Sequence, residues 1–236
     1  MRVPAIQGII DRRILVNFTV DPGIIQKILP APFTPKVYEG KAIAGICLIR
    51  LKNIRPKGFT DLIGISSENG AHRIAVEWMD KGIKKEGVYI PRRDSSSFLN
   101  NLAGGRIFPG KHFHTKFNVH EQNDHYHISF KSSDNTSISI DADKANSFDN
   151  NSIFKTLENA SAFFEKGEIG YSPNTNKLEG LKLKIYKWQV SPLKVTNVKS
   201  SFFENEVVFP KGSVKFDNAL LMQYADHEWN YIGEIN

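Results

Sequence analysis

One stretch in the middle of the chain gathers side chains that bind anions and transfer protons: Arg92, Arg93, Asp94, Lys111 and His112. Arginine can hold a carboxylate through two parallel hydrogen bonds. Because adjacent residues of a strand point to opposite faces, one of the two arginines can reach into a pocket while the other pairs with an acid. The sequence therefore predicts an arginine anchor for an anionic ligand, with a purely structural network of ion pairs as the alternative.

Lys111 and His112 offer nucleophilic and acid–base chemistry. Histidine has an ordinary pKa of about 6.5, which suits proton transfer near neutral pH. A lysine whose pKa is lowered by its surroundings can attack a carbonyl carbon. Only one of the two can face a common pocket, because neighbours on a strand point apart. The alternatives are an exposed lysine and a histidine held by structural hydrogen bonds.

Glu68 is the third candidate for proton transfer. It precedes Asn69-Gly70, a pair that favours a hairpin turn between two strands. Inside a pocket, the Glu68 carboxylate could orient a water molecule or accept a substrate proton. On the predicted turn it would simply be solvated, and both interpretations stay open.

Five histidines lie between residues 112 and 127, which invites a zinc proposal. His112 and His120 would be about 26 Å apart on an extended strand, too far to share one metal ion. We therefore expect no metal site and no organic cofactor. A surface site made by His120, His125 and His127 is the alternative.

The elements that must position these side chains are mostly strands. The clearest is a hairpin of residues 111–121 and 125–131, in which a two-residue turn at 123–124 would pair Phe117 with Phe130 and His120 with His127. The strongest helix pattern covers residues 152–166, and a short helix is predicted over 95–102. One mainly β (α+β) domain spanning residues 1–236, with two or three helices, is the simplest organisation.

Composition limits the classes of function. The chain has 236 residues, a net charge of +6 and one cysteine, Cys47, which is expected to be a reduced core thiol. The basic residues are dispersed, so nucleic acid is not an expected partner. No apolar run is long enough to span a membrane and no secretion signal is evident, so a cytoplasmic location is expected.

Five segments resemble one protein family. DRRILVNFTVDPGIIQKILPAPFTP (11–35) resembles the N-terminal signature of the acetoacetate decarboxylase-like superfamily. AHRIAVEW (71–78), GVYIPRRDSSS (87–97), GGRIFPGKH (104–112) and GEIGYSP (167–173) resemble a large bacterial family of uncharacterised proteins, a domain of unknown function, within it. The resemblance implies a cone-shaped, largely antiparallel β-barrel with a central pocket and flanking helices.

The resemblance also implies site residues. The decarboxylases use a pocket lysine that forms a Schiff base, a second lysine beside it, a glutamate and an arginine. Glu68 matches the glutamate and Arg12 lies near the position of the arginine. In the lysine segment, which also holds Arg106, the best alignment puts His112 at the reactive position with Lys111 before it. The double lysine is absent, which argues against Schiff-base decarboxylation.

The sequence therefore predicts a pocket for a small oxo-acid or related anion. Arg92 or Arg93, with Arg106 and Arg12, would bind the anion, and His112, Lys111 and Glu68 would do any chemistry. An enzyme of this kind would be a carbon–carbon lyase or act on a carbonyl group. A non-catalytic binding or sensing protein is the main alternative, and an interaction protein using its basic surface is the third. Exposed edge strands would favour a homo-oligomer.

Overall fold

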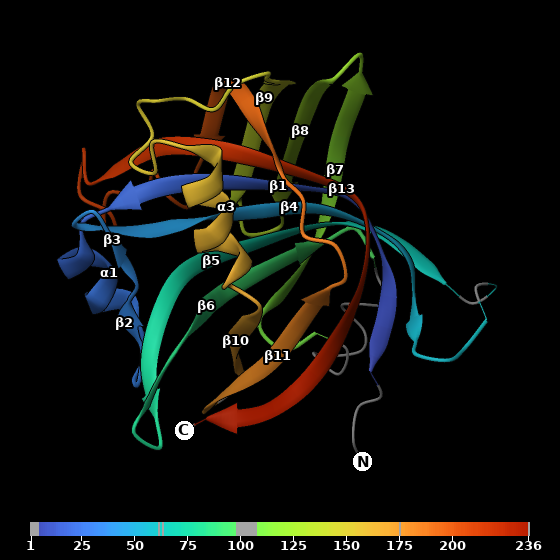
Figure 1. Ribbon diagram of the computed structural model, residues 1–236, viewed down its shortest axis with the longest axis horizontal. Coiled ribbons are helices and arrows are strands. Elements are labelled where there is room, and N and C mark those ends of the chain that lie inside the picture. The colour runs from blue at the N-terminus through green and yellow to red at the C-terminus, as the bar shows by residue number, and fades with distance from the viewer. Residues whose placement is uncertain (1–4, 61, 63, 98–107, 175, 236) are drawn as a thin grey trace.

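The computed structural model describes residues 5–60, 62, 64–97, 108–174 and 176–235 (Figure 1). Strands make up nearly all of its regular structure, and the described residues contain two helices, α1 and α3. The mainly β fold class predicted from the sequence is confirmed.

The elements of the first half are β1 (Ile6–Val20), α1 (Pro22–Ile28), β2 (Thr34–Pro35), β3 (Val37–Tyr38), β4 (Lys41–Pro56), β5 (Ile65–Asp80) and β6 (Ile83–Ser95). Those of the second half are β7 (His112–Gln122), β8 (His125–Ser132), β9 (Ser137–Lys144), α3 (Leu157–Glu165), β10 (Ile169–Asn174), β11 (Lys177–Ile185), β12 (Ser191–Ser200) and β13 (Val214–Ile235).

The strand pairings close two rings that share a wall. The larger ring runs β6-β7-β8-β9-β12-β13-β1-β4-β5 and returns to β6. The smaller ring runs β13-β11-β10-β6-β5-β4-β1 and returns to β13 through the β1–β13 pairing. Both rings therefore contain β1, β4, β5, β6 and β13. Figure 1 shows α3 lying over the shared strands, with β10 and β11 beyond its end.

The shared wall explains the most apolar run of the sequence. Residues 42–48 of β4 are all buried, although successive side chains point to opposite faces. One face packs inside the larger ring, where Ile46 lies, and the other packs toward α3, where Ile43 lies. A strand covered on both faces needs apolar residues at every position, as this one has.

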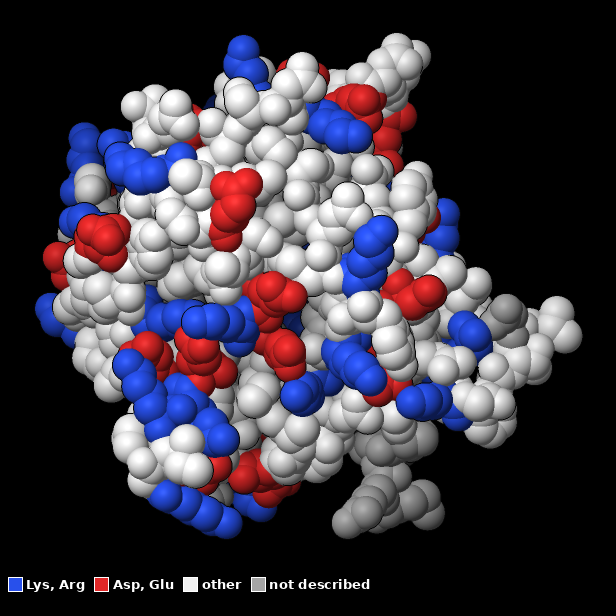
Figure 2. All heavy atoms as spheres, viewed as in Figure 1, with Lys and Arg blue, Asp and Glu red and all other residues white. Residues whose placement is uncertain are grey.

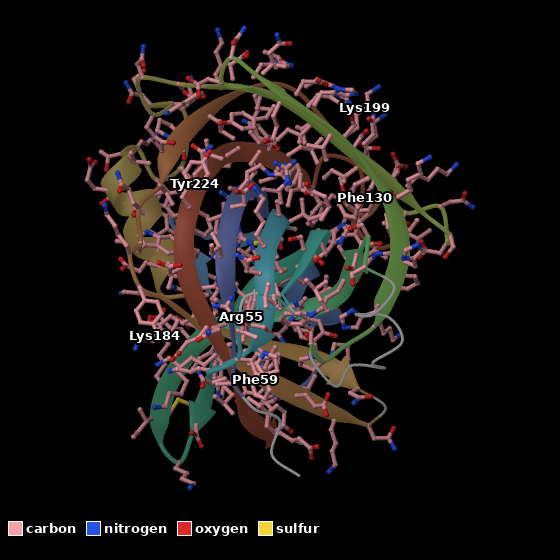
Figure 3. All side chains as sticks on the ribbon, turned by 90° about the vertical axis from the view of Figure 1, so that its right-hand side faces the viewer. Arg55, Phe59, Phe130, Lys184, Lys199 and Tyr224 are labelled. Atoms are coloured by element: carbon pink, nitrogen blue, oxygen red, sulfur yellow. The ribbon has the colours of Figure 1, made fainter. Side chains whose placement is uncertain are left out.

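Inside the larger ring, aromatic and branched side chains fill the space between opposite walls. Phe130 on β8 points into the ring (Figure 3) and packs against Gly70 on β5. A Cβ atom on Gly70 would lie 2.9 Å from Cε1 of Phe130, so a larger residue would require the Phe130 ring to move. The turn predicted at Asn69-Gly70 is therefore wrong: both residues lie inside β5 and pair with β4 and β6. The glycine serves packing across the ring rather than a bend.

The predicted hairpin of β7 and β8 is confirmed in its register. Phe117 pairs with Phe130 and His120 pairs with His127. Asn123 and Asp124 form the turn with φ of 51° and 61°, the left-handed values that a tight hairpin turn requires.

The helix predicted over 152–166 exists but starts later, at Leu157, with Thr156 as its N-cap. The Ser152 hydroxyl and the Ile153 N–H both bond to Asp217, and Lys155 has φ of 64°. These contacts tie the preceding turn to β13, so the helix begins after it. The helix predicted over 95–102 is wrong at its start, because Ser95 ends β6; residues 98–107 lie outside the described residues.

Charges are mixed on the surface. On the face that carries α3, Lys and Arg side chains alternate with Asp and Glu, as Figure 2 shows. None of the helices in the described part of the chain is long and apolar enough to cross a membrane.

Candidate functional site

A cavity of about 90 Å³ lies within the smaller ring, between the shared wall and α3. Its apolar lining includes Leu15 of β1, Ile90 of β6 and Phe163 and Phe164 of α3. Three arginines also line it: Arg13 of β1, Arg73 of β5 and Arg93 of β6. We call this space the arginine cavity. An apolar pocket with a few convergent charged groups is the usual form of a small-molecule site.

The three arginines have no acidic partner among the described residues. Arg13 donates a hydrogen bond to Sγ of Cys47 (3.7 Å), and Arg73 donates to the same sulfur (3.1 Å) and to Asn17. Arg93 donates to the Pro109 carbonyl (3.0 Å) and the Ser172 hydroxyl (3.3 Å). Buried cations are normally paired with anions. The arrangement is therefore suited to receive an anion from solution.

Burial lowers the pKa of Arg73, and it lowers the pKa of Arg93 to about 10. Both groups are cationic at neutral pH, because an arginine guanidinium is not deprotonated in proteins. The other two charged residues in the lining, Glu168 and Lys36, are already paired. Glu168 accepts from Lys182 at 3.1 Å, and Lys36 donates to Glu86 at 2.6 Å. The net charge that the cavity presents to a ligand comes from its arginines.

His112 lies beside Arg93, on the same side of the sheet, because β6 and β7 pair in parallel with Arg93 opposite His112. It lines a smaller pocket of about 40 Å³ that shares Arg93 and Trp229 with the arginine cavity. Burial, together with the charge of Arg93, lowers the pKa of His112 to about 4, so the ring is neutral at pH 7. Its Nε2 contacts the Phe108 carbonyl at 2.6 Å and so carries the proton, which leaves Nδ1 as an acceptor with no hydrogen-bond partner among the described residues.

Lys111 is exposed and does not line either of these pockets. Its contribution to this region is its backbone, whose carbonyl accepts from the Arg93 N–H at 2.9 Å. Of the described lysines, only Lys36 lines the arginine cavity.

Arg92 points away from Arg93, as expected for neighbours on a strand, and lies in a dense ion-pair network. It donates to Asp94 at 2.7 and 2.9 Å and also pairs with Asp134. Asp94 accepts further hydrogen bonds from the hydroxyls of Thr115 and Ser132. Of the two arginines proposed as anion anchors, Arg93 lines the cavity, whereas Arg92 forms ion pairs with two aspartates.

Arg12 and Glu68 come together, at 2.5 Å, but not in the arginine cavity. They form a cluster with Glu121 of β7 and Arg50 of β4, which donates to Glu68 at 2.5 Å. Since β7 belongs only to the larger ring, Arg12 reaches across that ring, on the face of β1 opposite to Arg13. Arg106 lies outside the described residues.

No group of three or more His, Cys, Asp or Glu side chains that could hold a metal ion occurs in the part of the chain that the structure describes. His125 and His127 instead contact Asp143 and Asp141, at 2.8 and 2.6 Å.

A family model described as an uncharacterized conserved protein, DUF2071, matches residues 10–224. The chain belongs to the DUF2071 family. No curated protein matches the sequence.

Solved structures of an acetoacetate decarboxylase and of related enzymes share the fold of the DUF2071 chain. An acetoacetate decarboxylase from Legionella pneumophila superposes with a TM-score of 0.66 at 14% identity, covering 99% of this chain and 88% of that one. An acetoacetate decarboxylase-like enzyme from Sphingomonas wittichii gives 0.58 at 9% identity, covering 100% and 94%. The enduracididine biosynthesis enzyme MppR, complexed with pyruvate, gives 0.53 at 11% identity, covering 100% and 91%. At these identities the likeness concerns the fold.

Sequence reasoning missed Arg13, Arg73 and Cys47 as cavity residues of the DUF2071 chain. A signal for the two arginines was available, because Arg13 precedes ILV and Arg73 lies in HRIAV, strand segments that are otherwise apolar. A charged residue on such a strand must meet a partner or a pocket. Nothing in the sequence indicated that β1, β4 and β5 would bring these three side chains together.

Stability of the DUF2071 protein is expected to fall as pH falls from about 6.5 to about 4. Burial lowers the pKa of His72, His112 and His227 to about 4. Unfolded histidine has a pKa of about 6.5, so between these values the unfolded chain binds more protons and acid favours it. The side chain of His72 is 1% exposed. Its shift alone should lower the free energy of unfolding by on the order of 3 kcal/mol between the two pH values.

Denaturant unfolding at about pH 7.5 and about pH 5 measures this effect. The free energy of unfolding should be lower at the acidic pH, and a His72→Gln variant should show a smaller difference between the two. Equal free energies in the wild type at both pH values would contradict the expectation.

Proposed function

We propose that the arginine cavity binds a small carboxylate, with 2-oxo acids as the leading class. One observation carries this proposal: Arg13, Arg73 and Arg93 line one cavity and have no acidic partner among the described residues. A guanidinium group matches a carboxylate in shape and charge. An anionic ligand would relieve the cost of burying these cations.

The size of the cavity supports a small ligand. One water-sized group needs roughly 10–15 Å³ of cavity volume. A cavity of about 90 Å³ thus has room for roughly six groups of this size, which suits a molecule such as pyruvate. The fold relative complexed with pyruvate is consistent with this class of ligand, although that likeness by itself concerns the fold.

Among lysines, only Lys36 lines the cavity in the described part of the chain, and it is paired with Glu86. This observation favours the second candidate, a binding or sensing protein without Schiff-base chemistry. An enzyme of this fold acting on a carbonyl or a carbon–carbon bond would have to use His112 for proton transfer. The atom that would accept the proton is Nδ1, which has no hydrogen-bond partner among the described residues.

The test combines calorimetric titration with borohydride trapping. Pyruvate should bind, and its neutral analogue pyruvamide should bind at least about tenfold more weakly, because one charge interaction is lost. After incubation with 2- and 3-oxo acids and reduction, the intact mass should be unchanged. Equal binding of the amide would contradict the anion site. A mass adduct that disappears in Lys111→Ala would instead establish Schiff-base catalysis.

Three broader expectations accompany the proposal: a single domain over residues 1–236, a cytoplasmic location and assembly as a homo-oligomer. The free thiol of Cys47 is consistent with a reducing compartment.

A further inference from the structure

Cys47, the single cysteine of the chain, is part of the arginine cavity rather than of a purely apolar core. It lies on β4 and is 3% exposed. Its Sγ atom accepts from Nε of Arg73 at 3.1 Å and from Arg13 at 3.7 Å. A buried structural cysteine is normally surrounded by apolar groups, whereas this one lies between two cations.

Arg13 gives an independent sign that the cavity is built for a ligand. The residue is 8% exposed, and its Nε atom is buried without a hydrogen-bond partner among the described residues. Arg13 lines the cavity, and among the described residues its side chain makes one hydrogen bond, the long contact to the Cys47 sulfur. A buried guanidinium with unused donors has capacity for another acceptor in the cavity.

The surroundings of the thiol favour its reactive form. Burial acts to raise the pKa of Cys47, but the charges and hydrogen bonds of Arg73 and Arg13 outweigh it, so the pKa is lowered. The thiolate is the nucleophilic form of cysteine, and neighbouring cations are what stabilise it at reactive sites. The other charged groups in the lining are Arg93, Lys36 and Glu168, and the last two are paired with residues outside the lining.

We propose that Cys47 is the nucleophile of the arginine cavity and adds through its sulfur to the carbonyl carbon of a 2-oxo acid. This inference rests on the proposed function, because the cavity arginines must hold the carboxylate. In a 2-oxo acid the carbonyl carbon is bonded directly to the carboxylate carbon. A carboxylate bound at the guanidinium groups that touch the sulfur therefore brings the electrophilic carbon next to it.

The addition is balanced and needs no oxidant or reductant. The thiolate forms a carbon–sulfur bond while the π bond of the ketone opens toward its oxygen. That oxygen takes one proton from solvent, and the product is a thiohemiketal. Reversal breaks the same carbon–sulfur bond and returns the thiolate. Arg13 and Arg73 act as positioning residues, since they hold both the sulfur and the carboxylate.

The first experiment compares two alkylating probes on the native protein by intact mass. Iodoacetate is an anion and iodoacetamide is neutral, and either is displaced at carbon by the thiolate with loss of iodide. Because the chain has one cysteine, every thiol adduct reports on Cys47. A cleft of one charge sign raises the rate for its counter-ion by about tenfold or more. Iodoacetate should therefore react at least about tenfold faster than iodoacetamide, relative to the same ratio in denaturant.

Arg93→Gln tests the contribution of the cavity charge. Arg93 lines the cavity but does not contact the sulfur. This variant should lose the preference for iodoacetate, because the rate with iodoacetate depends on the charge of the cavity as well as on the thiol, whereas the rate with iodoacetamide reports on the thiol alone. Pyruvate should protect the wild-type thiol from both probes. The role of Cys47 is overturned if the native thiol reacts with neither probe. It is also overturned if the ratio of the iodoacetate rate to the iodoacetamide rate is the same in the native protein as in denaturant.

The second experiment observes the adduct directly. Pyruvate labelled with ¹³C at its carbonyl carbon should show a tetrahedral carbon signal when bound to the wild type and a ketone signal when bound to Cys47→Ser. A ketone signal in both proteins overturns the nucleophile but leaves the proposed function standing, because the ligand is bound. Failure of pyruvate to bind either protein, with no preference for iodoacetate, overturns both.

Discussion

Replacing Asp94 with alanine is expected to lower the free energy of unfolding by about 3 kcal/mol or more. Asp94 is 1% exposed and accepts hydrogen bonds from Arg92, Thr115 and Ser132. Its loss would leave the buried Arg92 guanidinium with one acidic partner, Asp134, and would remove an acceptor from the hydroxyls of Thr115 and Ser132. Removing one member of a buried ion pair is costly because the other charge stays buried.

Denaturant titration of Asp94→Ala and Asp134→Asn measures this difference. Asp134 is the other acid bound to Arg92, but its side chain is 39% exposed. Because water replaces much of the interaction at such a site, Asp134→Asn should cost less than about 1 kcal/mol. Similar losses for the two variants would show that burial of Asp94 does not govern the network.

Replacing Arg93 with glutamine is expected to lower the affinity for pyruvate by about 30-fold or more. That factor corresponds to about 2 kcal/mol, the lower end of what a buried charged contact to a ligand contributes. Stability should be unchanged or higher, because Arg93 is a half-buried cation with a carbonyl and a hydroxyl as its described partners. A fall in affinity without a fall in stability distinguishes a ligand-binding arginine from a structural one.

Lys116→Gln is the matched control for this variant. Lys116 is exposed on β7 and lines none of the pockets described above. Its replacement by glutamine removes the same unit of charge as Arg93→Gln does. Its affinity for pyruvate should stay within about twofold of the wild type, because exposed charges are screened over about 8–10 Å. Equal affinity of Arg93→Gln and the wild type would contradict the anion site.

Arg92 and Arg93 thus have opposite expected effects although they are adjacent. The alternation of side chains along a strand predicts that one faces a pocket and the other an acid. The sequence did not indicate which arginine faces the pocket and which pairs with the acid. The pairing of β6 with β7 and β10 decides it, because it sets Arg93 beside His112 and Ser172 and turns Arg92 toward Asp94.

The turn at Asn69-Gly70 shows where local signals fail. Asn-Gly favours a hairpin turn when the flanking strands pair with each other. In this protein both residues instead pair with β4 on one side and β6 on the other, and Phe130 from β8 covers the glycine. Contacts far apart in the sequence outweigh the local preference. The hairpin turn at Asn123-Asp124 was predictable because its strands are each other's neighbours.

The sequence by itself determined the mainly β class, the register of the β7–β8 hairpin and the superfamily resemblance, because these depend on alternation, turn residues and motifs that are local. It also indicated an arginine for an anion. Only the tertiary structure decided that Arg13, Arg73 and Cys47 meet at one cavity, and that Arg12 and Glu68 meet elsewhere. The physical reason is that β1, β4 and β5 form a wall shared by two rings. Adjacent side chains of one strand point to opposite faces, so they lie in different rings.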